Sequence, residues 1–61
     1  MTKGEKVKYW LHGILREGIF AEEIKFLNVT YYRIVDLPRY LDDRNVGWWV
    51  AKEQIHNVRH G

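Results

Sequence analysis

The chain has no cysteine, no serine, a single proline and no apolar run near the ~18 residues of a membrane-spanning helix. Without cysteine it can form neither a disulfide nor a thiolate metal site, which favours a reducing compartment, so we expect a cytoplasmic protein. Without serine, Thr2 and Thr30 are the only aliphatic hydroxyl nucleophiles. The first residues are polar and charged, so we expect neither a secretion signal nor a membrane anchor.

Charge of one sign is not concentrated in any segment. Ten Lys and Arg residues oppose eight Asp and Glu residues, the net charge is +2, and each half of the chain carries five basic and four acidic residues. A dedicated nucleic-acid binder more often shows a basic stripe or cluster, because the neutralisation of phosphates requires local positive charge. The five glycines are scattered, so no glycine-rich phosphate loop is predicted.

Aromatic residues, by contrast, are abundant for so short a chain. The 61 residues include three Trp, four Tyr and two Phe. A domain of about 60 residues buries only about 60% of the surface of its unfolded chain, so its core depends on its largest side chains. We therefore expect one domain over residues 1–61 with no enclosed active-site cavity, and we predict a protein that is not an enzyme and binds no cofactor.

Alternation of side chains predicts a strand over residues 4–11, with Val7 and Tyr9 on one face. Breaks at Gly13 and Gly18 predict that the stretch between them is a loop or a bend in a following strand. The first part of the chain is therefore expected to be β structure.

Residues 19–28 fit two structures. A helix would line one face with Phe20 and Ile24, which are four residues apart. A strand would place Phe20, Ile24 and Phe26 on one face, and it would point Glu22 inward unless a bulge intervenes. We favour the strand, because no Ser, Thr or Asp stands where a helix N-cap is needed.

Residues 29–37 are rich in β-branched and aromatic side chains, which crowd a helix and suit a pleated sheet, so they form the clearest predicted strand. Pro38 cannot continue a central strand, and it opens a predicted loop over residues 38–47 with one helical turn. The remaining predicted elements are a strand at 48–51, a tight turn at 52–55, a short strand at 56–59 and a frayed end.

The predicted fold is mostly β: a small five-stranded barrel with a short 3-10 or single helical turn. Five short strands are too few for a sandwich, and closure into a barrel removes exposed strand edges. The order of features resembles the SH3-like barrels of bacteria and phages. It has an opening Gly-x-x-Val at residues 4–7, a Tyr-rich middle strand, a Trp-containing strand and a one-turn connector into a final strand.

This resemblance implies a function as well as a fold. Residues 48–51, Trp-Trp-Val-Ala, resemble the paired tryptophans of eukaryotic signalling SH3 domains. The chain lacks that family's Ala-Leu-Tyr-Asp-Tyr and Gly-x-Phe-Pro stretches, so the resemblance does not extend to the polyproline groove that those residues form. It is similar instead to small prophage-encoded SH3-like proteins, which implies a phage or prophage origin and a role without catalysis.

Titratable residues give no strong site. His56 and His60 have the spacing of a helical metal pair, but they lie in a predicted strand and tail with little acidic support, so no metal site is predicted. The acidic residues have no activated nucleophile beside them, and such carboxylates more often solvate loops than catalyse. These acidic candidates are Glu22, Glu23, Asp36, Asp42 and Asp43.

The aromatic residues carry the main functional prediction, because they exceed what one face of a small barrel can bury. Neighbouring residues on a strand point to opposite sides, so one of Trp48 and Trp49, and one of Tyr31 and Tyr32, faces outward unless a loop covers it. Exposed Trp and Tyr are frequent anchors for protein partners. We predict a non-enzymatic protein-binding module, monomeric or homodimeric. Its predicted partner site comprises Trp10, Arg39, Tyr40, Arg44, Trp48 and Trp49.

The alternative prediction is a small β-barrel that binds nucleic acid. The same aromatic rings could stack on bases while basic side chains meet phosphates. The basic candidates are Lys6, Lys8, Arg33 and Arg39. The even mixture of charges makes this the second prediction, and nothing predicts a membrane partner.

Overall fold

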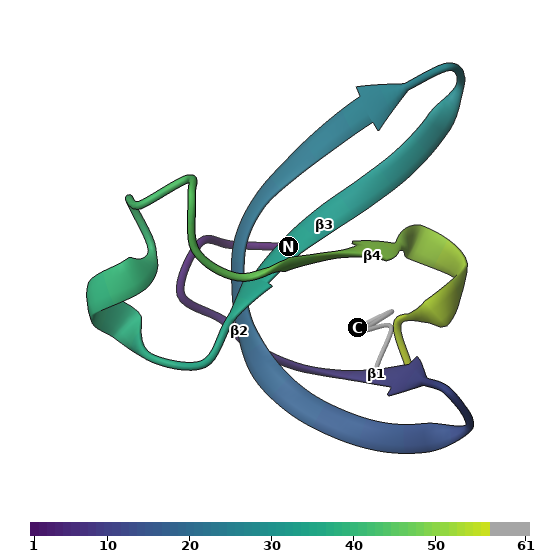
Figure 1. The fold of residues 1–61 in the computed structure, drawn as a ribbon, viewed down its shortest axis with the longest axis horizontal. Coiled ribbons are helices and arrows are strands. Elements are labelled where there is room, and N and C mark those ends of the chain that lie inside the picture. Colours follow the sequence, from purple (N-terminus) through teal and green to yellow (C-terminus); the bar gives the residue numbers. More distant parts are fainter. Residues whose placement is uncertain (57–61) are drawn as a thin grey trace.

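The computed structural model describes residues 1–56 and shows an antiparallel sheet of four strands in the order β1-β2-β3-β4. The mostly β prediction is therefore confirmed. Two short 3-10 turns, η1 before β4 and η2 after it, complete the described elements (Figure 1). The bounds are β1 Lys6–Leu11, β2 Ile14–Phe26, β3 Val29–Val35, η1 Pro38–Tyr40, β4 Trp48–Ala51 and η2 Lys52–Gln54.

Strand β2 is long and strongly curved (Figure 1), and it resolves the ambiguity of residues 19–28 in favour of a strand. Its register with β3 shifts between Phe20 and Glu22, so Ala21 is the extra residue of a bulge. The bulge lets Phe20 point into the core while Glu22 lies beside Arg33 on the opposite face. Glu22 therefore avoids burial in the apolar core.

Both hairpins close with turns of two residues. His12 and Gly13 have φ of 53° and 77°, and Leu27 and Asn28 have φ of 52° and 68°. Positive φ at both central residues defines the type I′ turn, whose twist matches that of the flanking strands. The stretch between Gly13 and Gly18, which was expected to be a loop or a bend in a following strand, belongs to β2 from Ile14 onward and is not a loop.

Replacing Leu27 by Asn is expected to raise the free energy of unfolding by about 1 kcal/mol. A left-handed backbone costs a residue with a branched side chain roughly 1–2 kcal/mol, whereas Asn tolerates it. Leu27 is 79% exposed, so its removal costs little packing. Urea denaturation followed by tryptophan fluorescence measures the change. The control Leu27→Ala keeps the strain, and equal stabilities of the two variants would contradict the prediction.

The predicted five-stranded closed barrel is wrong for the described residues, which form an open sheet of four strands. Within residues 1–56, the chain returns to β1 after η2 at Ile55, which forms an isolated antiparallel bridge with Tyr9. The His56 N–H also donates to the carbonyl of Lys8 at 2.8 Å. A single bridge is not a strand, so β1 and β4 are not joined by a ladder. The strand expected at 56–59 lies, from residue 57 onward, outside the described residues.

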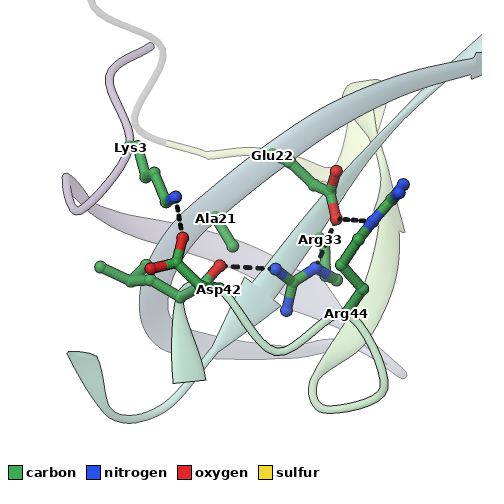
Figure 2. A pocket seen from close by; sticks show the side chains of 7 residues that line it. Lys3, Ala21, Glu22, Arg33, Asp42 and Arg44 are labelled. Carbon is green, nitrogen blue, oxygen red and sulfur yellow. Dashed lines mark hydrogen bonds and ion pairs between the residues drawn. The ribbon is translucent and has the colours of Figure 1, made fainter. Parts of the chain in front are cut away.

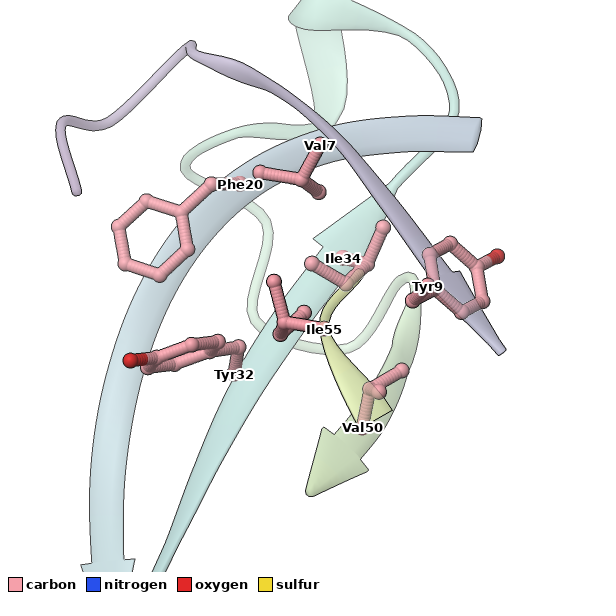
Figure 3. Close-up of a cluster of buried hydrophobic side chains, with 7 residues drawn as sticks. All are labelled: Val7, Tyr9, Phe20, Tyr32, Ile34, Val50 and Ile55. Atoms are coloured by element: carbon pink, nitrogen blue, oxygen red, sulfur yellow. The ribbon is translucent and has the colours of Figure 1, made fainter. Parts of the chain in front are cut away.

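One face of the curved sheet encloses the apolar core (Figure 3). The residue after η2, Ile55, points into the middle of this cluster (Figure 3). Phe20 and Tyr32 meet edge to face with ring centroids 5.3 Å apart. Trp48 packs at the rim, where its Nε1 donates to the hydroxyl of Tyr9 at 2.7 Å. The buried members of the core are Val7, Tyr9, Phe20, Tyr32, Ile34, Val50 and Ile55.

Candidate functional site

Loop 36–47, which joins β3 to β4, is held in place by the buried side chain of Arg33. This side chain is 2% exposed, and each guanidinium nitrogen donates to a partner within the protein. Nη2 donates to the carbonyl of Leu41 at 2.7 Å, and Nη1 donates to the carbonyls of Asp43 and Val46 at 2.9 Å each and to that of Tyr40 at 3.4 Å. The prediction that Arg33 meets phosphates is wrong, because burial and these bonds remove it from the surface.

The carboxylate of Glu22 completes this arrangement (Figure 2). Its Oε2 accepts hydrogen bonds from Nε of Arg33 at 2.8 Å and from Nε of Arg44 at 3.0 Å. The hydrogen bond from Arg33, assisted by Arg44, lowers the pKa of Glu22 below its usual value of 4.5. A lowered pKa means that this carboxylate stabilises the fold above its unfolded pKa, and the contribution is lost as the pH falls through the folded value.

A depression of about 140 Å³ lies beside these groups (Figure 2). It is small compared with the roughly 300–1,000 Å³ of typical ligand sites. Its charged side chains are already engaged with one another, since Lys3 forms an ion pair with Asp42 and Arg44 one with Glu22. Its lining residues are Lys3, Ala21, Glu22, Arg33, Leu41, Asp42 and Arg44. The ion pairs that line the depression therefore attach the loop and the N-terminal segment to the sheet.

Three of the five acidic candidates have structural partners. Glu22 is bound by two arginines, and Asp42 pairs with Lys3, whose hydrogen bond lowers the pKa of that carboxyl. The carboxylate of Asp43 accepts the backbone N–H of Asn45 at 3.1 Å and forms a local turn. These contacts indicate that the three carboxylates order the N-terminal segment and loop 36–47.

A different surface is formed by the side of β2, β3 and β4 that faces away from the core. Because Tyr32 and Ile34 point into the core, Tyr31 and Arg33 point the other way. The register places Ile24 beside Tyr31, Val29 beside Phe26, and Trp49 beside Arg33. Exposure reaches 61% at Phe26 and 44% at Trp49. We call this surface the outer face; its apolar members are Ile24, Phe26, Val29, Tyr31 and Trp49.

The neighbouring aromatic pairs point to opposite sides, as predicted. Trp49 is exposed on the outer face, while Trp48 packs against the core and uses its indole N–H for Tyr9. Tyr32 is buried and Tyr31 is half-buried. Trp48, which the sequence also placed in the partner site, is half-buried, and it packs against the core rather than on the outer face.

The other predicted partner residues are dispersed. Trp10 is exposed on β1, at the opposite end of the strand order from β4, and its ring meets His56 edge to face with centroids 5.7 Å apart. Arg39 lies over the ring of Tyr40 on η1, 5.2 Å from the centroid. Glu22, Arg33 and Trp49 form one cross-strand row on the outer face. Arg44, from loop 36–47, lies beside Glu22. Of the six residues, Trp49 and Arg44 are the pair that the structure associates with the outer face.

The predicted nucleic-acid contacts are also divided. Lys6 and Lys8 are exposed on β1, where they alternate with the buried Val7 and Tyr9. Arg39 is on η1, next to its own aromatic neighbour, and Arg33 is buried. The structure therefore leaves two lysines of one strand and one loop arginine from that set exposed.

Sequence reasoning missed the exposed part of the outer face. It grouped Ile24 and Phe26 with the buried Phe20, because all three have the same parity. The bulge at Ala21 reverses that relation, so the residues after it lie on the opposite face. The sequence contained a signal for this arrangement, because Glu22, Ile24 and Phe26 alternate along one strand and therefore share a face. A carboxylate is expected to avoid the apolar core, so all three side chains are expected to point outward.

Comparison with protein-family models, curated proteins and solved structures finds no match for this chain. Among residues 1–56, no group of three or more His, Cys, Asp and Glu side chains is placed to hold a metal ion. His60 of the candidate histidine pair lies outside the described residues. Within the described part of the chain, no helix has the length and apolar character needed to span a membrane.

Proposed function

We propose that this protein is a non-enzymatic protein-binding module whose contact surface is the outer face. One observation carries the proposal: five apolar side chains from three strands lie next to one another on an exposed face of the sheet. Contiguous exposed apolar surface commonly marks a site of protein interaction. Trp49 is the expected anchor, because Trp is strongly enriched among the residues that dominate binding energy.

The partner we propose is a protein segment with apolar side chains and a carboxylate at one end. The charged end of the outer face holds two guanidinium groups, those of Arg33 and Arg44, against the single carboxylate of Glu22. Arg33 is buried, whereas the side chain of Arg44 is 68% exposed. The exposed guanidinium of Arg44 favours an acidic group on the partner.

The SH3-like resemblance remains part of this proposal. Its support is the order of elements, in which antiparallel strands follow one another along the chain and a 3-10 turn precedes the return of the chain to β1 at Ile55. The resemblance implies a compact binding protein in a phage or prophage setting, which suits a contact face without catalytic groups. Nucleic acid is the competing partner, and the test below separates the two.

Replacing Trp49 by Ala is expected to weaken partner binding at least tenfold. Peptides selected from a random display library on the purified protein should carry apolar residues next to Asp or Glu, and their affinity is measured by fluorescence polarisation. Truncation of a central Trp anchor commonly costs about 2 kcal/mol or more. The control Trp10→Ala removes an equally exposed ring from β1, and it should leave affinity unchanged.

A second variant tests the charge preference separately. Arg44→Ala should abolish the selection of acidic residues while the apolar preference persists. Basic consensus peptides, or equal loss of affinity in the Trp10 and Trp49 variants, would overturn the proposal. Salt-sensitive binding of an oligonucleotide, with no peptide selected, would favour the nucleic-acid function instead.

A further inference from the structure

The second half of β2 has an open edge. On its other side from β3, β2 pairs with β1 as far as Ile19, and Phe20 exchanges backbone hydrogen bonds of 2.8 Å with the segment at Gly4 and Glu5. From residue 22 to 26, that side of β2 has no backbone partner among residues 1–56. Figure 1 shows this part of the β2–β3 hairpin projecting from the rest of the molecule. An open strand edge is a template for pairing with another strand.

The geometry of the hairpin determines which backbone groups face this open edge. Phe26 and Val29 flank the two-residue turn, so they are the pair that exchanges both backbone hydrogen bonds. Hydrogen-bonded and non-hydrogen-bonded pairs alternate along an antiparallel ladder. Glu23 and Lys25 therefore direct their N–H and C=O groups away from β3, toward the open edge.

We propose that this edge pairs antiparallel with the same edge of a second copy of the chain, about a two-fold axis through Ile24. In that register Glu23 of one copy lies opposite Lys25 of the other on one side of the axis. On the other side, Lys25 of the first copy lies opposite Glu23 of the second. Both are hydrogen-bonded pairs, so four backbone hydrogen bonds and two pairs of opposite charge form together. The two sheets become one continuous sheet across the dimer.

Charge complementarity selects both this partner and this register. A shift of the axis by one residue places Lys25 opposite Lys25, or Glu23 opposite Glu23, and like charges directly opposite each other are unfavourable. Unrelated strands that lack a basic and an acidic residue two positions apart are disfavoured in the same way. The sequence Glu-Ile-Lys at 23–25 is therefore complementary to itself in this antiparallel register.

Apolar contact on the outer face favours the same pairing. Ile24 faces Ile24 of the second copy in a non-hydrogen-bonded pair, where side chains approach most closely, and Phe26 lies diagonally from it. Both side chains are exposed in the single chain. Pairing covers part of both side chains on the outer face, on the side of the sheet opposite the apolar core. The dimer also joins the two outer faces into one larger contact surface.

Only residues 22–26 form the open edge, so the dimer interface is smaller than a stable interface, which buries about 800 Å² on each partner. We therefore expect a weak dimer whose dissociation constant is on the order of 10–100 μM, at the transient end of protein interfaces. Sedimentation velocity between 5 μM and 1 mM should show the shift from monomer to dimer.

Charge reversal at two exposed positions tests the proposal. Lys25→Glu and Glu23→Lys each place like charges across the axis, so each variant alone should dimerise at least tenfold more weakly than the parent chain. A mixture of the two variants restores opposite charges at every position of the mixed pair, so dimers should reappear on mixing. The double variant, in which both charges are exchanged, should dimerise like the parent.

Circular dichroism of each variant controls for folding, which exposed charges should not disturb. A parent chain that stays monomeric at 1 mM, or single variants that dimerise as well as the parent, would overturn the proposal. The outcome is separate from that of the proposed function, because the reversed charges lie on the core side of the hairpin, away from Trp49 and Arg44. Loss of the dimer would leave peptide binding by the monomer intact.

Discussion

Replacing Arg33 by Met is expected to lower the free energy of unfolding by about 3–5 kcal/mol, because one partner of a buried ion pair and its backbone hydrogen bonds are lost together. Four loop carbonyls lose their donor, and Glu22 loses its closer cation. A chain of 61 residues is stable by only about 3–9 kcal/mol, so the variant loses much or all of its fold. Urea denaturation, followed by circular dichroism and tryptophan fluorescence, measures the loss.

Two further variants keep this prediction testable if the Met variant does not fold. Arg33→Lys retains the charge but loses the planar fork that reaches several carbonyls, so a loss of about 2 kcal/mol is expected. Glu22→Gln retains an acceptor for Arg33 but leaves the buried guanidinium without its carboxylate, so a loss of about 1–3 kcal/mol is expected. A Lys variant as stable as the parent would contradict the role assigned to the guanidinium.

Replacing Gly47 by Ala is expected to cost about 3 kcal/mol. Gly47 has φ of +101°, a conformation that side chains rarely adopt, and a Cβ built there would lie 2.5 Å from the carbonyl oxygen of Ile34 and 2.9 Å from Cγ1 of Val35. The strain of the backbone alone is worth about 1–3 kcal/mol. The clash with the buried backbone of β3 adds to it, since that strand lies in the middle of the sheet order beside β4.

Gly13 provides the matched control. Its φ of +77° is also left-handed, but a Cβ there would meet nothing within 4 Å. Gly13→Ala should therefore show the backbone cost alone, about 1 kcal/mol. Thermal denaturation of both variants compares the two positions. Equal losses would show that the close approach to Ile34 contributes nothing.

Much of the β structure could be predicted because local alternation and β-branched residues determine where strands occur. The strands at 29–37 and 48–51 are present, with ends shifted by up to two residues, and the β structure of 19–28 is present to Phe26 but begins earlier, at Ile14. The closed barrel could not be predicted correctly, because closure depends on pairing between residues distant in sequence. In the described residues that pairing is reduced to the single bridge between Tyr9 and Ile55.

The candidate site was harder to predict than the strands, for two physical reasons. Arg33 lies at an alternating position of a strand, where an arginine is ordinarily exposed, and its burial depends on carbonyls supplied by loop 36–47. The exposure of Ile24 and Phe26 depends on the bulge at Ala21, which the sequence indicated only through the parity of Glu22. The outward direction of one tryptophan followed from strand geometry alone, and Trp49 has that direction.

The hydrogen bonds from Arg33 fix the backbone path of loop 36–47 without depending on the amino-acid sequence of the loop. The guanidinium recognises main-chain oxygens, which every residue has, and it ignores the side chains attached to them. Exposed loop positions such as Arg39 and Asn45 can therefore be exchanged for other residues while the same path of the chain is retained. The loop backbone thus stays constant while its exposed side chains vary. A library with randomised codons at these positions is therefore a source of variants with new binding specificities.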